Sequence, residues 1–163
     1  MRRFAMALVT TLAVATALVP LAAAGNGVKV SGTYTVPIFG STTCSAVGSS
    51  GFMYRCETTG LVSAYEGDLV GNAVADFTSL VNCKALRETG HGTETFTSTE
   101  VGVVGTLSWI DQFSADVDCS FAPYFFIPIH LDINSVAVKG TGAYAGVQGR
   151  LTFTDTTYSG TLH

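Results

Sequence analysis

The sequence predicts an all-β protein, most simply an eight-stranded antiparallel barrel. All 18 glycines lie beyond residue 24, where period-two alternation recurs and no segment keeps helical spacing of its apolar residues. A closed barrel leaves no free strand edges, and a two-sheet sandwich is the alternative. Gly67, Gly71 and Gly105, in or beside expected strands, favour the sharp coiling of a small barrel.

The N-terminal segment has the features of a secretory signal peptide. Arg2 and Arg3 precede an apolar run over 4–21 that ends in small residues at 22–24, and we expect cleavage after Ala24. A retained membrane anchor is the alternative, but no other stretch is long and apolar enough to span a bilayer. We expect a secreted, extracellular chain, with residues 25–163 as a single domain and no stable membrane insertion.

The first strand is expected at 28–36, where Val28, Val30, Tyr34 and Val36 share one face. The eight expected strands cover 28–36, 52–66, 68–80, 92–101, 103–113, 127–138, 149–155 and 157–162.

Three later segments refine this scheme. In the strand at 103–113, the residues expected together on the apolar face are Val103, Leu107, Trp109 and Phe113. In the strand at 127–138 the apolar parity changes beyond residue 134, which predicts a bulge near Ser135. The strand at 92–101 has no plainly apolar face and suits a semi-polar cavity or an open rim.

Five large apolar or aromatic residues crowd the segment 121–127, around Pro123 and directly before Pro128. It suits an aromatic lid, a surface for a protein partner, or a plug for one barrel end.

Charge excludes two classes of partner. Without the leader, six basic residues face twelve acidic ones. Nucleic-acid binding needs clustered positive charge, so we expect no nucleic-acid partner. The same deficit argues against docking on an anionic membrane.

Four cysteines in an exported chain predict two disulfides. Three pairings are possible, and we favour Cys44 with Cys56 and Cys83 with Cys119, which are neighbours in sequence. Zinc is the rival interpretation. It lacks support because no two cysteines have CxxC spacing and no histidine clusters with them, so we expect no metal.

The stretch Gly140-Thr141-Gly142-Ala143-Tyr144-Ala145 satisfies the GxGxx(G/A) pattern of dinucleotide-binding folds. That pattern requires a following helix whose N-terminus holds the pyrophosphate, whereas alternating, threonine-rich sequence follows here. We therefore interpret the glycines as a turn between two strands and expect no cofactor.

Three stretches resemble, in the same order, those of a family of uncharacterised bacterial barrel proteins grouped with allene oxide cyclase and plant dirigent proteins. They are residues 65–71, residues 99–107 and residues 140–149. The resemblance implies an eight-stranded antiparallel barrel. It implies little about activity, because relatives include a cyclase, proteins that steer the coupling of phenolic radicals, and barrels without a known function.

The candidate acid–base residues are carboxylates. Glu66 and Glu100 are the catalytic candidates, since both lie in the family-like stretches, and Asp68 and Glu94 are further carboxylates of interest. An inward carboxylate would have the raised pKa that a general acid or base needs, whereas an outward one would be solvated.

Five further residues are candidates for ligand binding: Tyr34, Phe96, Trp109, Tyr144 and Arg150. Trp109 also suits core packing, and Arg150 suits an ion pair with Asp155.

These observations leave three functions open. The first is binding of a small, largely apolar molecule in or at the mouth of the barrel. The second is a cofactor-free cyclase or isomerase acting in the cavity. The third is a structural or interaction protein that uses residues 121–127.

Overall fold

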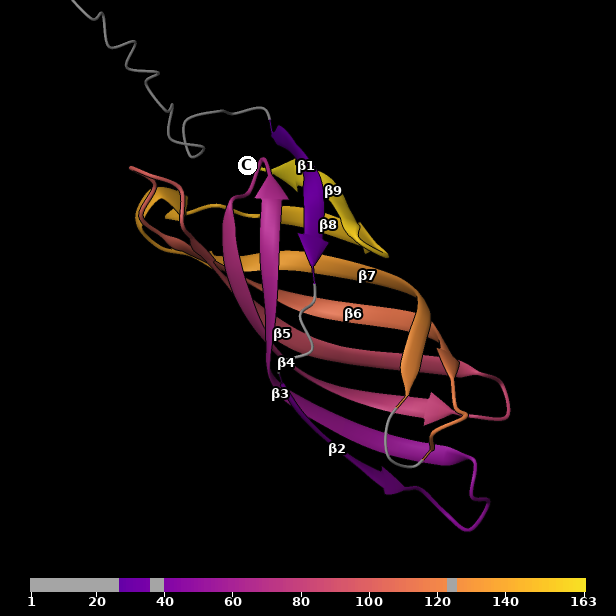
Figure 1. Ribbon diagram of the computed structural model, residues 1–163. Coiled ribbons are helices and arrows are strands. Elements are labelled where there is room, and N and C mark those ends of the chain that lie inside the picture. Colours follow the sequence, from indigo (N-terminus) through magenta and orange to yellow (C-terminus); the bar gives the residue numbers. More distant parts are fainter. Residues whose placement is uncertain (1–26, 36–39, 123–125) are drawn as a thin grey trace, which may run out of the picture.

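The computed structural model describes residues 27–35, 40–122 and 126–163. Their strands form one antiparallel sheet in the order β1-β9-β8-β7-β6-β5-β4-β3-β2, and β1 also pairs with β3 (Figure 1). The expected signal peptide at 1–24 and Val36 of the first expected strand lie outside the described residues.

The strands are β1 (Val28–Thr35), β2 (Ser41–Ala46), β3 (Met53–Gly67), β4 (Gly71–Asn82), β5 (Arg87–Ser98), β6 (Thr106–Asp118), β7 (Ile127–Gly140), β8 (Gly149–Thr154) and β9 (Thr157–Leu162).

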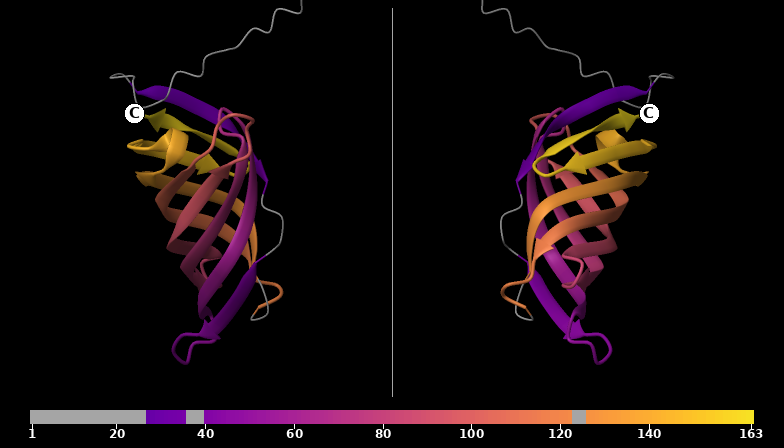
Figure 2. Two further views of the ribbon diagram at one scale, coloured as in Figure 1. Left: turned by 90° about the vertical axis from the view of Figure 1, so that its left-hand side faces the viewer. Right: turned by 90° about the vertical axis from the view of Figure 1, so that its right-hand side faces the viewer.

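The pairing of β1 with both β9 and β3 closes a ring of eight strands, which confirms the predicted barrel. We call the end with the β3–β4, β5–β6 and β7–β8 connections the upper end. The short strands β1, β8 and β9 lie near this end, whereas β3 to β7 continue downward (Figures 1 and 2). The eight-stranded ring is therefore complete only in the upper half.

The ninth strand, β2, was not predicted. It pairs with the lower part of β3, outside the ring, and most of its residues are exposed. Its sequence, STTCSA, lacks apolar alternation because neither face of the strand is buried, so no face requires apolar residues.

The predicted bulge near Ser135 is wrong. Register between β6 and β7 is continuous from His130 to Ala137, and it shifts instead on either side of that stretch. Ser135 keeps its inward position and is fully buried, while Val136 points outward and is 43% exposed. The parity rule fails here because a polar residue occupies the interior.

Two apolar clusters fill the two ends of the barrel. The upper cluster comprises Val30, Tyr34, Tyr65, Leu69, Ala73, Phe96, Leu107, Trp109, Ala137, Tyr144, Val147, Leu151, Phe153, Tyr158 and Leu162. The lower cluster is built on Tyr54, Cys56, Val81, Ala115 and Val117.

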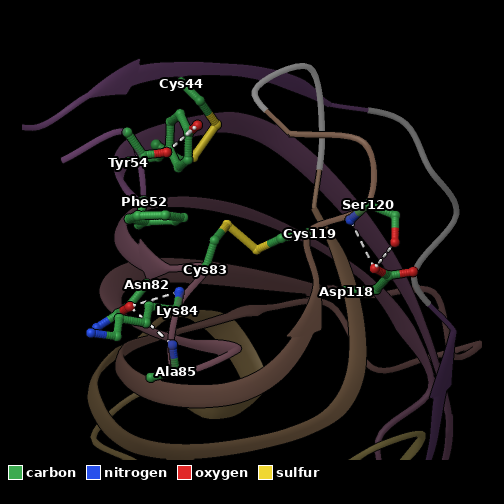
Figure 3. The surroundings of a disulfide bond; sticks show 12 residues. Cys44, Phe52, Tyr54, Asn82, Cys83, Lys84, Ala85, Asp118, Cys119 and Ser120 are labelled. Atoms are coloured by element: carbon green, nitrogen blue, oxygen red, sulfur yellow. Dashed lines mark hydrogen bonds between the residues drawn. A yellow bond between two sulfur atoms is a disulfide. The ribbon is translucent and has the colours of Figure 1, made fainter.

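Both favoured disulfides are confirmed, and both lie at the lower cluster. Cys44–Cys56 joins directly opposed residues of β2 and β3, and Cys83–Cys119 joins the β4–β5 turn to the segment after β6 (Figure 3). In that turn, the Asn82 side chain accepts hydrogen bonds from two backbone amides. Two disulfides fit an oxidising location.

Part of the aromatic segment packs onto this lower end. Phe126 lies 5.2 Å from Tyr54 between ring centroids, and Ala122 also contacts the lower cluster. Phe121 is 49% exposed, and residues 123–125 lie outside the described part. The described residues that pack inward act as a plug.

Candidate functional site

Four of the five predicted ligand-binding residues lie inside the upper cluster. Tyr34, Phe96, Trp109 and Tyr144 are each at most 5% exposed. The Phe96 ring stacks on Trp109 and meets Tyr144 edge-on. Close packing at this level means that the upper half of the interior is filled by the protein's own side chains.

Arg150, the fifth, lies on β8 with an exposed side chain on the outer face. Asp155, its predicted partner, instead accepts hydrogen bonds from the Leu131 backbone amide and contacts His130 Nδ1 at 2.9 Å. The Leu131 amide is the main cause that holds the pKa of Asp155 below its usual range.

Glu66 and Glu100 both lie on the surface of the barrel and are exposed. Asp68 is also exposed and accepts a hydrogen bond from the Ser31 backbone amide. Of the four carboxylates that the sequence singled out, Glu94 is the one that points inward.

Glu94 is buried in the barrel and bonded on both oxygens. Tyr65 Oη donates to Oε1 at 2.9 Å, and Trp109 Nε1 donates to Oε2 at 2.8 Å. Burial raises the pKa of Glu94, and the two hydrogen bonds act in the opposite direction. Three strands, β3, β5 and β6, thus meet at one carboxyl group.

Asp111 lies on the same inner face, on the neighbouring strand β6, and is 7% exposed. The Ser135 hydroxyl donates to Asp111 Oδ1. Burial raises the pKa of Asp111 to about 7, with Glu94 adding to the rise and the Ser135 hydrogen bond opposing it. Asp111 therefore changes its charge near neutral pH.

Tyr34 Oη is a third polar group at this level. It is buried and has no hydrogen-bond partner among the described residues. The Tyr34 ring stacks on that of Tyr65, with centroids 5.9 Å apart. Burial raises the pKa of Tyr34, and the nearby Glu94 and Asp111 contribute to that rise. We call Tyr34, Tyr65, Glu94, Asp111 and Ser135 the polar layer.

Among the described residues, no lysine or arginine side chain balances the polar layer. Every lysine and arginine of the described residues is exposed. Burying carboxyl groups without a counter-ion is costly, so such groups are uncommon except at functional sites. Glu88, further down β5, is a third buried carboxyl whose pKa burial raises.

Below the polar layer, the inward side chains are partly open to solvent. Phe77 and Phe113 meet edge-on with centroids 5.2 Å apart, and both are half-buried. Leu61 and Leu131 are half-buried as well, whereas Ile133 packs against the upper cluster. We call Phe77, Phe113, Leu61 and Leu131 the lower inner face. An aromatic, solvent-reachable surface next to hydrogen-bonding groups has the composition of a small-molecule site.

The outer face of the same sheet carries two adjoining hollows. The larger, of ≈ 550 Å³, is lined by Arg55, Leu80 and His91 and also reaches Phe113. The smaller, of ≈ 340 Å³, continues past His91 to Ile110 and also reaches Phe77. Both are shallow and do not reach the polar layer.

The glycine-rich stretch at 140–149 connects β7 to β8 through one 3-10 turn, Gly142–Tyr144. A Cβ at Gly140 would stand 1.7 Å from the Tyr144 carbonyl oxygen, so close backbone approach explains that glycine. The connection leads directly into a strand, as the sequence predicted. All three family-like stretches lie at the upper end of the barrel (Figure 1).

Asp111 and Ser135 were missed from the sequence. Position 111 lies midway between Trp109 and Phe113, and alternate residues of a strand share one face. This spacing could have predicted that Asp111 points inward. Ser135 gave no comparable signal.

No family model matches the chain, and no curated protein is significantly similar to it. Within residues 27–35, 40–122 and 126–163, no three His, Cys, Asp or Glu side chains are grouped as a metal site. The same residues contain no helix long and apolar enough to cross a bilayer.

Proposed function

We propose that this chain is a secreted binding protein that holds one small, largely apolar molecule on the lower inner face of its barrel, against the polar layer. The observation that carries the proposal is the half-exposed Phe77–Phe113 pair, which packs edge-on below the polar layer and whose two residues also line the hollows of the same sheet. The packed upper cluster directs the ligand to the lower half.

The polar layer would orient the ligand. Asp111 is slightly exposed, and Tyr34 Oη has no hydrogen-bond partner among the described residues, so both would serve a bound hydrogen-bonding group that reaches this layer. A few polar groups in an otherwise apolar site fix the orientation of a ligand and give specificity.

Export is part of the same proposal. The two disulfides support it, and the N-terminal sequence carries the features of a cleavable leader. Membership of the allene oxide cyclase-like and dirigent-like barrels is likewise proposed, on the three family-like stretches and the shared ring of eight strands. Fold similarity by itself assigns no activity.

Binding is tested with N-phenyl-1-naphthylamine, a neutral apolar fluorophore, and by native mass spectrometry of the secreted protein. We expect saturable dye binding, and Phe113→Ala should weaken it at least about fivefold because a buried aromatic contact contributes on the order of 1 kcal/mol or more. Ile110→Ala, on the outer face of the same strand, is the matched control.

If the dye does not bind saturably and the mass spectra show no bound molecule, the lower inner face is not a ligand site. Equal losses in Phe113→Ala and Ile110→Ala would place the dye elsewhere.

Proton transfer without a cofactor, as in an isomerase or cyclase, is the second candidate function. It is favoured by Asp111, whose pKa of about 7 suits a general acid or base at neutral pH, and by Glu94 beside it. Conversion of a molecule recovered by mass spectrometry should be lost in Asp111→Asn and retained in Glu100→Gln. Retention in Asp111→Asn would refute this role.

A further inference from the structure

The described interior of this barrel contains buried carboxyl groups but no basic side chain. Glu94 and Asp111 share one layer, whereas all described lysines and arginines are exposed. The hydrogen bonds supplied by the protein occupy both oxygens of Glu94 and one oxygen of Asp111. Asp111 itself remains 7% exposed.

Tyr34 provides an independent indication of a ligand. Its side chain is 96% buried, since only 4% remains exposed, yet its hydroxyl has no hydrogen-bond partner among the described residues. Leaving a buried hydroxyl unpaired costs about 1–3 kcal/mol, so such groups in a native protein call for an explanation. The Tyr34 ring stacks on Tyr65, whose hydroxyl donates to Glu94, so Tyr34 lies next to the buried carboxyl groups.

The available groups are mainly acceptors. A carboxylate accepts only, and a phenol oxygen accepts as well as donates. A protonated amine has two or three donors and no acceptor, so it complements the Asp111 carboxylate and the Tyr34 oxygen together. The aromatic faces of Phe77 and Phe113 lie below, where they suit the apolar body of such a molecule and attract its charge.

We propose that the molecule held in this barrel is a protonated amine with an apolar body, whose ammonium group enters the polar layer between Asp111 and Tyr34. This rests on the proposed binding function. The ammonium supplies the positive charge that the interior lacks, and the lower inner face receives the hydrocarbon part.

The pH dependence of binding follows from the groups that surround Asp111. They are Glu94 from β5, Tyr34 from β1 and Tyr65 from β3, together with the uncharged Ser135 from β7, and Asp155 acts on Tyr34 from the β8–β9 turn. The two tyrosine hydroxyls have raised pKa values and stay protonated at neutral pH. Asp111 therefore changes its charge near pH 7, and the Asp111→Asn variant separates its contribution from that of Glu94, whose pKa burial also raises.

The test compares cyclohexylmethylamine with cyclohexylmethanol, which have the same apolar body. Both are titrated into the disulfide-bonded protein at pH 6 and pH 8, and binding is followed through the fluorescence of Trp109, the single tryptophan, which donates to Glu94. The amine is protonated at both pH values. With a pKa of about 7, Asp111 is about tenfold more ionised at pH 8 than at pH 6.

We expect the amine to bind about tenfold more tightly at pH 8 than at pH 6 and the alcohol to bind equally at both, since only the amine meets the ionised carboxylate. Asp111→Asn should abolish both the pH dependence and the preference for the amine over the alcohol. Asp116→Asn, which removes an exposed carboxylate from the same strand, should leave all four affinities unchanged.

The outcomes separate the two proposals. If alcohol and amine bind with equal affinity at both pH values, the amine assignment is overturned and the binding function stands. If neither binds, and the neutral dye also fails, the binding function falls and the amine assignment falls with it. Persistence of the amine preference in Asp111→Asn would also overturn the assignment, because the charge would then act elsewhere.

Discussion

The pH dependence of folding stability gives a direct measure of the buried carboxyl group at Asp111. Its pKa is about 7 in the folded protein against 3.8 when unperturbed, so the folded state binds the proton more tightly than the unfolded state. Stability from this group is therefore greatest at low pH, and it decreases as the pH rises from about 4 through 7. Most acidic residues have a lowered pKa in the folded protein, so their contribution to stability is lost as the pH falls. The contribution of Asp111 is instead lost as the pH rises.

The magnitude follows from the two pKa values. A tenfold change in protonation equilibrium corresponds to about 1.4 kcal/mol, so full ionisation of Asp111 costs the folded state about 4 kcal/mol. About 2–3 kcal/mol of this cost falls between pH 5 and pH 8. Asp111→Asn keeps the shape of the side chain and cannot ionise, so the variant should lack this part of the pH dependence.

Urea unfolding at pH 5 and pH 8 measures the effect for the wild type, Asp111→Asn and the exposed control Asp116→Asn. The difference between wild type and Asp111→Asn therefore measures Asp111 together with its coupling to the neighbouring Glu94. The stability gap between the two pH values should shrink by about 2–3 kcal/mol in Asp111→Asn alone. An unchanged gap would show that Asp111 ionises at its ordinary pKa and is solvated in the folded protein.

Three further predictions concern stability, each measured by urea or thermal unfolding. Tyr65→Phe removes a hydrogen-bond donor from the buried Glu94 and should lower the free energy of unfolding by about 1–3 kcal/mol. Tyr34→Phe removes an unpaired hydroxyl and should leave stability unchanged or raise it. Equal effects would contradict the difference in hydrogen bonding between the two tyrosines. Gly140→Ala places a methyl group against a carbonyl oxygen, so it should prevent folding or destabilise the protein several-fold more than Gly146→Ala. Position 146 has open space and carries only the roughly 1 kcal/mol strain of a positive φ. Similar losses of stability in the two variants would refute this explanation. Replacing both cysteines of Cys83–Cys119, which spans 36 residues, should cost about 4 kcal/mol, and a change below about 1 kcal/mol would contradict its role in restricting the unfolded chain.

The sequence was sufficient for the barrel because most of its inward positions are apolar. Leu107 and Trp109 lie two residues apart on β6 and both face the core, as does Val30 on β1. Both disulfides were also predicted, since the nearest cysteines in sequence lie on adjacent segments of an antiparallel sheet. β2 was missed because alternation reports a buried face, and this strand is exposed on both sides apart from the half-buried Cys44.

The candidate site was predicted less well, and a single physical cause explains the errors. Sequence patterning identifies the inside of a strand by its apolar residues, but the middle of this barrel is polar. The change of apolar parity at Ser135 was therefore interpreted as a bulge, although Ser135 is buried in the core. Asp111 was not considered, although it lies between Trp109 and Phe113 on the face predicted to be apolar. Of the polar layer, Glu94 and Tyr34 were singled out from the sequence, and Glu94 lies on the strand that had no clear apolar face.

The coincidence of these errors is informative in itself. A sequence that follows local rules almost everywhere and breaks them at one layer is expected to break them where function requires it, because buried unpaired polar groups reduce stability. Asp111 and Ser135 come from opposed positions on β6 and β7, so their two departures from the pattern form one interaction. If stability alone had shaped this interior, apolar residues at these positions would serve better than a carboxyl group. The polar layer is therefore the part of the barrel where a ligand should first be sought.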